Sequence, residues 1–287
     1  MNDGALELAR RLLLEAPAEP PADLLYARWY HREGETLRDY PPGGAYRSVA
    51  LEPDRFETGW TVLAPLPYPP GAVTAERKGE RRDVAPPDCA PAARGRLRLA
   101  AGEPLLVDPM TSGVSGGFWH LWSGGWRRGP PERLQRLYLA VAPGSEIEAV
   151  RRFARLADPA ESWSIKFLTG PHRAGRRDPA VLYLERERPL DSGWVAAIAD
   201  ALAGSLDGEP PPLTRPMAPG VAWAEDPGGG LSFGEHLCRL LAAAAQAPGA
   251  LDDETGWRAA AAGAFESAGL DIARPEKCAA GRANGDG

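Results

Sequence analysis

The sequence predicts an α+β fold in which a central, mostly antiparallel sheet is covered by helices. Residues 136–142 alternate in strand fashion, and Ser145 then opens a helix pattern with Glu148 placed to complete a capping box. Two strand patterns, 163–168 and 180–184, follow in succession before a second helix at 192–203. This β-α-β-β-α order predicts an antiparallel strand pair in a helix-covered sheet.

The N-terminal part is expected to add helices and short strands. A Leu-rich amphipathic pattern covers residues 5–16, and a second, aromatic helix pattern covers 23–31. Short strands are expected at 46–51 and 60–63. We therefore assign residues 1–64 to elements that pack on the core.

Residues 65–100 consist mostly of Pro, Gly, Arg and acidic residues, which predicts a surface loop or a partly disordered insertion. The core is expected at 101–270 and a flexible tail at 271–287. Within the core we also expect strands at 105–108 and 221–223 and helices at 233–246 and 252–268. The Gly- and Trp-rich segment 113–126 either lines a peptide groove or packs in the core.

Composition excludes several classes of function. The balance of 33 basic and 39 acidic residues gives a net charge of −6, which argues against nucleic acid as the main partner. Apolar runs are too short to cross a membrane, the first residues lack a signal-peptide pattern, and the three Cys form no CxxC pair. We therefore expect a cytoplasmic protein without a nucleic-acid or membrane partner.

Sequence motifs for phosphate loops, dinucleotides and serine nucleophiles are missing, and the four His lack metal-binding spacing. We expect no metal and no cofactor. Gly228-Gly229-Gly230 before Ser232 either holds an anion at a helix start or forms a plain turn.

Lys166 is the most informative residue, because only three of the 33 basic residues are Lys and it alone lies in an apolar strand pattern. Arg stays protonated in proteins, whereas a partly desolvated Lys can lose its proton and act as a general base. The alternative is a Lys on the solvent side of a strand, with its stem packed and its ammonium in water.

Other basic and phenolic residues are expected near Lys166. Arg136 and Tyr138 share one face of their strand, and short connections predict that this strand neighbours the strand of Lys166. Arg176 and Arg177 lie in a basic turn before the next strand, where guanidinium groups suit phosphate. The alternative is a solvated turn.

The stretch 213–234, which contains PGVAWAEDPGGGLSFG, strongly resembles the HopA-type effector family, named after a type III secretion effector of plant pathogens. The likeness covers roughly residues 130–245 and includes Arg136-Leu137-Tyr138, Lys166 and 178–184. Stand-alone bacterial members occur with aminoglycoside-phosphotransferase-like kinases in class V lanthipeptide and thioviridamide-like peptide pathways. The resemblance implies the lyase of that pair: a phosphoserine/phosphothreonine lyase that converts a phosphorylated precursor peptide to dehydroamino acids without a cofactor.

A more distant similarity is to phosphothreonine lyases, in which one strand carries Lys-x-His and a later strand carries the base Lys. Arg136-Leu137-Tyr138 takes the Lys-x-His place here, so Tyr138 replaces the His that acts as the acid. We expect Lys166 as base and Tyr138 as acid, with His120 and then His236 as alternatives. The expected phosphate ligands are Arg136, Arg177, Arg176 and Arg239.

Three other functions stay open. A non-catalytic subunit that binds the peptide or activates the kinase fits the missing His at position 138, with residues 65–98 as its docking element. A cyclase that adds Cys thiols to dehydroamino acids would also use a base, but the sequence has no zinc-ligand set. A secreted effector is the third.

Overall fold

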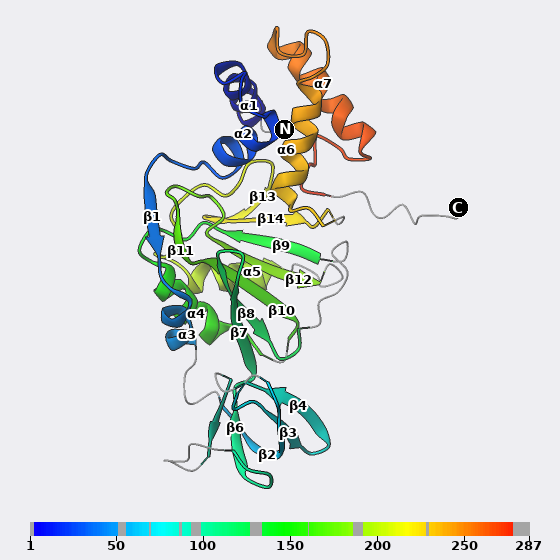
Figure 1. Cartoon of the computed structure of the whole chain (residues 1–287). Helices are drawn as coiled ribbons and strands as arrows, with labels where there is room; N and C mark the ends of the chain where they lie inside the picture. The colour runs from blue at the N-terminus through cyan, green and yellow to red at the C-terminus, as the bar shows by residue number, and fades with distance from the viewer. Residues whose placement is uncertain are drawn as a thin grey trace, which may run out of the picture.

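The computed structural model describes residues 3–50, 56–68, 70–85, 88–92, 99–126, 134–159, 161–185, 192–227 and 230–277. Its centre is a seven-stranded sheet in the order β13-β14-β9-β12-β10-β8-β7, with every pair antiparallel (Figure 1). The α+β prediction is confirmed. The strands are β7 (Met110–Ser115), β8 (Phe118–Ser123), β9 (Leu134–Leu139), β10 (Trp163–Leu168), β12 (Ala180–Glu185), β13 (Arg215–Ala218) and β14 (Val221–Glu225).

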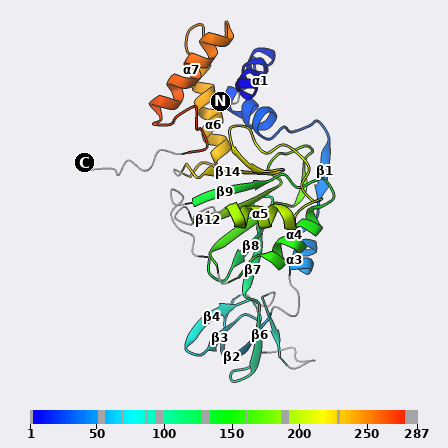
Figure 2. The same cartoon turned by 180° about the vertical axis from the view of Figure 1, so that it is seen from behind.

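One face of this sheet forms the main hydrophobic core. Alternate residues such as Leu137, Ile165 and Leu182 point to this face and are fully buried. Three helices cover it: α3 (Gly43–Ala50), α4 (Glu146–Leu156) and α5 (Ser192–Ala201). In Figure 2, which views the molecule from behind, α4 and α5 lie in front of the strands. Burial of this face therefore fixes the register that places the residues of the opposite face.

The opposite face is covered only in part. A second core joins Tyr138, Val181 and Ala224 of the sheet to a group of helices at one end of the molecule (Figure 1). These helices are α1 (Asp3–Glu15), α2 (Pro21–Leu24), the π-helical η1 (Leu25–Tyr30), α6 (Phe233–Ala244) and α7 (Glu254–Ser267). None of the described helices is both long and apolar enough for a membrane span.

A separate five-stranded sheet lies between residues 57 and 107, in the order β4-β3-β2-β6-β5. It has its own core, which includes Trp60, Val73 and Leu105. Lys78 and Gly79, with φ angles of 51° and 86°, make the two-residue turn that joins β3 to β4. The strands are β2 (Glu57–Pro65), β3 (Val73–Arg77), β4 (Glu80–Val84), β5 (Cys89–Pro91) and β6 (Pro104–Val107).

Residues 65–98 were therefore wrongly predicted as a loop, although 69, 86–87 and 93–98 lie outside the described residues. Val73, Ala75 and Val84 alternate with charged residues and turn inward, which is sufficient for a small core. The charged residues between them give these segments the composition of a loop, which obscures the alternation.

Three smaller predictions were also wrong. Of the strand expected at 46–51, residues 46–50 are helical and 51 lies outside the described residues: Tyr46 and Ala50, one helical turn apart in α3, are both buried. Ser145 precedes α4 without a capping bond from its side chain, and Glu148 pairs with Arg151 and Arg152 instead. Residues 271–277 of the expected tail lie beside β14, where Glu276 O accepts a bond from Glu225 N, whereas 278–287 lie outside the described residues.

Candidate functional site

Lys166 lies in a row of side chains that crosses the partly covered face of the sheet. It stands opposite Val181 of β12 on one side and His120 of β8 on the other. Val181 in turn stands opposite Tyr138 of β9, and directly opposed residues share a face. The strands of Tyr138 and Lys166 are thus separated by β12, which corrects the prediction that they are neighbours. Two strand spacings, about 10 Å, separate their backbones.

A second row runs beside the first and brings in Arg136. Arg136 stands opposite Tyr183, which stands opposite Ser164 of β10. The Tyr183 ring lies between two cations: its centroid is 5.3 Å from Arg136 Cζ and 5.7 Å from Lys166 Nζ. Arg136 and Lys166 are therefore held on one face by the same aromatic ring.

The ammonium of Lys166 is held by aromatic rings and not by carboxylates. Its Nζ lies 4.1 Å from the centroid of Phe118, and Arg176 Cζ lies 5.9 Å from the same ring. Within the described parts of the chain, no hydrogen bond or ion pair engages Nζ. The half-buried Lys166 is therefore available to a ligand, whereas Arg136 and Arg176 line the same hollow with a carboxylate, Asp226 or Asp178, beside each of them.

Two adjoining hollows meet at Lys166. The smaller has a volume of about 180 Å³ and extends toward the N-terminal helices, and the larger, about 420 Å³, extends toward β8. Both are lined by Arg136, Lys166 and Ser232. The smaller also contains Tyr26, Tyr30, His31, Glu33, Arg176 and Asp178, and the larger contains His120, Trp122, Trp126 and Tyr183.

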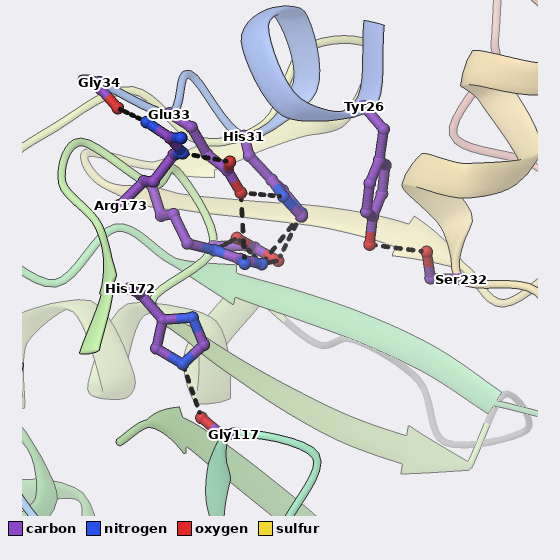
Figure 3. A network of polar contacts seen from close by, with 10 residues as sticks. Tyr26, His31, Glu33, Gly34, Gly117, His172, Arg173 and Ser232 are labelled. Carbon is purple, nitrogen blue, oxygen red and sulfur yellow. Dashed lines mark hydrogen bonds and ion pairs between the residues drawn. The ribbon is translucent and has the colours of Figure 1, made fainter. Parts of the chain in front are cut away.

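The smaller hollow is closed by an ionic cluster that the sequence did not reveal (Figure 3). His31 places Nε2 3.3 Å from Asp178 Oδ2 and Nδ1 3.4 Å from Glu33 Oε1. Arg176 Nε donates to Asp178 Oδ1 at 3.0 Å. Burial opposes ionisation of Asp178, but His31, Arg176 and Lys166 outweigh it and hold the pKa of this carboxyl well below its usual range.

Three phenols line the same hollow. The hydroxyls of Tyr30 and Tyr138 are buried and interact with each other, although neither forms a hydrogen bond of normal geometry with a described residue. Their rings meet edge to face, with centroids 6.5 Å apart. Burial raises the pKa of both phenols. Tyr26 forms a bond of 3.4 Å with Ser232 (Figure 3), and burial raises its pKa to about 12. All three are protonated at neutral pH, so each can donate a proton or a hydrogen bond.

The motif AEDPGGGLSFG builds the rim between the two hollows. Asp226 accepts bonds from Nε and Nη2 of the buried Arg136, the first at 2.8 Å, and so orients the guanidinium. Ser232 then caps α6 in a reciprocal capping box with Glu235. Gly234 lies against Tyr30: a Cβ at this position would be 2.3 Å from the Tyr30 ring. Residues 228–229 lie outside the described residues.

The structure brings together some of the predicted site residues and not others. Arg176 lines the smaller hollow, and His120, whose Nε2 lies 3.2 Å from Ser115 Oγ, lines the larger. Arg177 binds Glu209 at 2.9 Å and the Trp29 carbonyl at 3.0 Å, outside both hollows. Arg239 is exposed on α6 and His236 is half-buried there, and neither lines a hollow at Lys166.

Tyr26, His31 and Glu33 were missed as site residues. They precede Lys166 by more than 130 positions, and the only sequence signal was the aromatic pattern of the helix at 23–31. Within the described ranges, no group of three or more His, Cys, Asp or Glu is arranged to hold a metal ion.

Comparison with known proteins agrees with this architecture. Two solved effector proteins from Pseudomonas syringae are similar over 95% of both chains at 13% identity: that of pathovar tomato strain DC3000, with a TM-score of 0.54, and that of pathovar syringae strain 61, with 0.52. At this identity the likeness shows a shared fold. No curated protein matched the chain. The model of the HopA1 effector protein family matches residues 113–277, which include both rows of the site, and the chain therefore belongs to this family.

Proposed function

We propose that this protein is a lyase that eliminates phosphate from phosphorylated Ser or Thr of a peptide. The observation that carries the proposal is the arrangement around Lys166: an amine without an ionic partner among the described residues, between Arg136 and Arg176, where two hollows meet. A β-elimination needs a base for the Cα proton and cations for the departing phosphate, and this group of residues supplies both.

In the proposed reaction, Lys166 acts as the amine and takes the Cα proton of the phosphorylated residue. The electron pair of the C–H bond forms the Cα=Cβ double bond, and the bond from Cβ to the phosphate oxygen breaks. Phosphate leaves with that bonding pair, stabilised by Arg136 and Arg176. Lys166 then releases its proton to solvent. The products are dehydroalanine or dehydrobutyrine and inorganic phosphate.

The acid that protonates the leaving oxygen is proposed to be Tyr138. Tyr138 lines the smaller hollow, and its buried hydroxyl interacts with Tyr30 without a hydrogen bond of normal geometry to a described residue, so it can turn to a substrate oxygen. Arg136, which lowers the pKa of Tyr138 against the effect of burial, would stabilise the phenolate until it regains a proton from solvent after the phosphate has left. His120, on the other side of Lys166 in the larger hollow, is the second candidate. Tyr138→Phe and His120→Gln variants distinguish the two by their elimination rates.

Family membership supports the wider setting of the proposal. The substrate would be a ribosomal precursor peptide phosphorylated by an aminoglycoside-phosphotransferase-like kinase, as in class V lanthipeptide and thioviridamide-like biosynthesis, and the reaction would take place in the cytoplasm. No cofactor enters the proposed chemistry.

Intact-mass spectrometry of a phosphoserine peptide incubated with the purified protein tests the proposal. We expect each phosphorylated site to lose the mass of one phosphoric acid, and an unphosphorylated copy of the peptide to stay unchanged. An unchanged phosphopeptide, both alone and with the kinase present, would contradict the proposal.

The second candidate function is a non-catalytic subunit that holds the peptide or activates the kinase. Two observations favour it: Tyr138 stands where the phosphothreonine lyases that the sequence distantly resembles carry a His, and Asp226 already engages two nitrogens of Arg136. It predicts that adding the protein raises kinase turnover without any phosphate loss from the product.

A further inference from the structure

A third hollow continues the site toward the small sheet. It has a volume of about 630 Å³ and is lined by Arg77, Arg81 and Arg82 of β3 and β4 on one side. On the other side it is lined by Trp122 and Trp126, which also line the larger hollow at Lys166. Because Trp122 and Trp126 line both, the two hollows adjoin at these indoles, and together they lead from Lys166 toward the small sheet.

The charges of the third hollow favour an acidic ligand. Its lining contains three guanidinium groups and two carboxylates, Glu57 and Glu80. Both carboxylates lie beside Arg77, at 3.0 Å and 3.6 Å. Its other two cations are therefore not neutralised by the lining.

Arg81 and Arg82 differ in their partners: Arg81 has a carboxylate outside the lining beside it, and Arg82 has none among the described residues. The side chain of Arg81 is 71% exposed and pairs with Glu76 on the neighbouring strand. Arg82 donates from Nη1 to the Asp108 carbonyl at 3.1 Å and forms no ion pair with a carboxylate of the described residues. This hydrogen bond to a neutral backbone carbonyl orients the Arg82 guanidinium but leaves its positive charge unpaired.

The backbone of β4 adds a second feature. β4 is an outer strand of its sheet and pairs with β3 alone among the described strands. An outer strand has unpaired N–H and C=O groups that an extended peptide can pair with. The outer strand β4, which carries Arg81 and Arg82, and the two indoles thus lie around the same hollow.

We propose that this surface, formed by β4, Arg81, Arg82, Trp122 and Trp126, binds an acidic, extended segment of the substrate peptide that flanks the phosphorylated residue. The inference rests on the proposed function, because its occupant is the flank of the same peptide. The phosphorylated residue enters at Lys166, and Asp or Glu side chains of the flank reach Arg81 and Arg82. The small sheet is then a substrate-recognition element.

Fluorescence anisotropy with two labelled phosphoserine peptides tests this inference. The peptides differ only in a flank of Glu or of Gln, and binding is measured with the Lys166→Ala protein, so that the peptide stays intact. We expect the Glu peptide to bind about five- to tenfold more tightly, the difference that two partly exposed ionic contacts provide. An Arg81→Gln, Arg82→Gln double variant should remove this preference. Arg258→Gln, a change in a remote exposed pair on α7, should retain it.

Equal affinity of the two peptides for the Lys166→Ala protein would overturn the inference, as would a preference retained by the double variant. Thermal melting shows whether the double variant is folded. A salt titration does not depend on that variant: the Glu preference of the Lys166→Ala protein should decline as salt rises, and a salt-independent preference would contradict an ionic origin. Loss of phosphate is measured separately with the wild-type protein. A preference for the Glu peptide without elimination would therefore refute the proposed lyase activity but support the proposed binding surface.

Discussion

Arg176 and Arg177 are adjacent in the sequence but have opposite surroundings. Arg176 binds Asp178 and lines the hollow at Lys166, whereas Arg177 binds Glu209 and the Trp29 carbonyl outside that hollow. Because a charge-assisted bond to phosphate contributes about 1.5–3 kcal/mol, we expect Arg176→Gln to raise the KM for a phosphopeptide by at least about tenfold. Arg177→Gln should leave KM within about twofold of the parent. Steady-state kinetics of both variants, with melting curves to confirm folding, checks this, and equal effects would contradict the placement of the phosphate.

At the residue scale, the sequence predicted side chains whose chemistry is visible by itself. Lys166 is distinctive because the chain otherwise uses Arg, and Arg136 and Tyr138 follow from the period of a strand. It could not distinguish Arg176 from Arg177, because their environments depend on where Glu209 and Asp178 lie in space. For the same reason His31 was not predicted, since its partner Asp178 is distant in the chain.

The second residue of helix α6 is a glycine, Gly234, and Tyr30 packs against it. A methyl group at Gly234 would be 2.3 Å from that ring, so Gly234→Ala must displace Tyr30 and the smaller hollow with it. We expect a loss of about 1–3 kcal/mol in the free energy of unfolding, together with a lower elimination rate. The matched control is Gly263→Ala in α7, where an added Cβ would meet no atom within 4 Å. This change should raise the free energy of unfolding by about 0.5–1 kcal/mol. Urea denaturation compares the two, and a stabilised Gly234→Ala protein would contradict this packing.

Asp108 lies between β6 and β7, where the small sheet joins the main one. Its Oδ1 accepts a bond from Met110 N, but its Oδ2 is buried with no partner among the described residues, and burial raises its pKa from 3.8 to about 6. The folded state therefore binds a proton that the unfolded state has lost. As pH rises from about 4 to about 6, ionisation of Asp108 therefore lowers the free energy of unfolding. At pH 7 the loss reaches up to about 3 kcal/mol.

We expect Asp108→Asn to stabilise the protein at pH 7, because its side-chain oxygen can still accept from Met110 N without carrying a charge. The gain should vanish below about pH 4, where Asp108 is protonated in both states. Chemical denaturation of both proteins across this pH range measures the difference. A gain that is the same at every pH would contradict the assignment.

At the element scale, strands with long apolar runs were predicted well and short mixed ones were not. β10 occupies the predicted residues 163–168, because five of its six residues are buried. β3 and β4 bury only alternate residues among Arg, Asp and Glu, so their composition resembled that of a loop. Residues 46–50 form the end of helix α3 because Tyr46 and Ala50 both face the main core.

At the scale of the whole molecule, the site is assembled from three parts of the chain. The sheet supplies Lys166, Arg136 and Tyr138, the N-terminal helices supply Tyr26 and His31, and the start of α6 supplies Ser232. The sequence predicted the α+β class and the family. It did not predict that β12 lies between β9 and β10, because strand order depends on contacts along the whole sheet.

Replacement of Lys166 tests the central claim most directly, with the elimination rate and phosphopeptide affinity measured on the same protein. We expect Lys166→Arg, which keeps the charge but cannot lose a proton, to lower the single-turnover rate by about 10²- to 10⁴-fold while phosphopeptide still binds. The exposed Lys277→Arg serves as the control and should retain the full rate. Elimination by the Lys166→Arg protein at the wild-type rate would show that Lys166 is not the base.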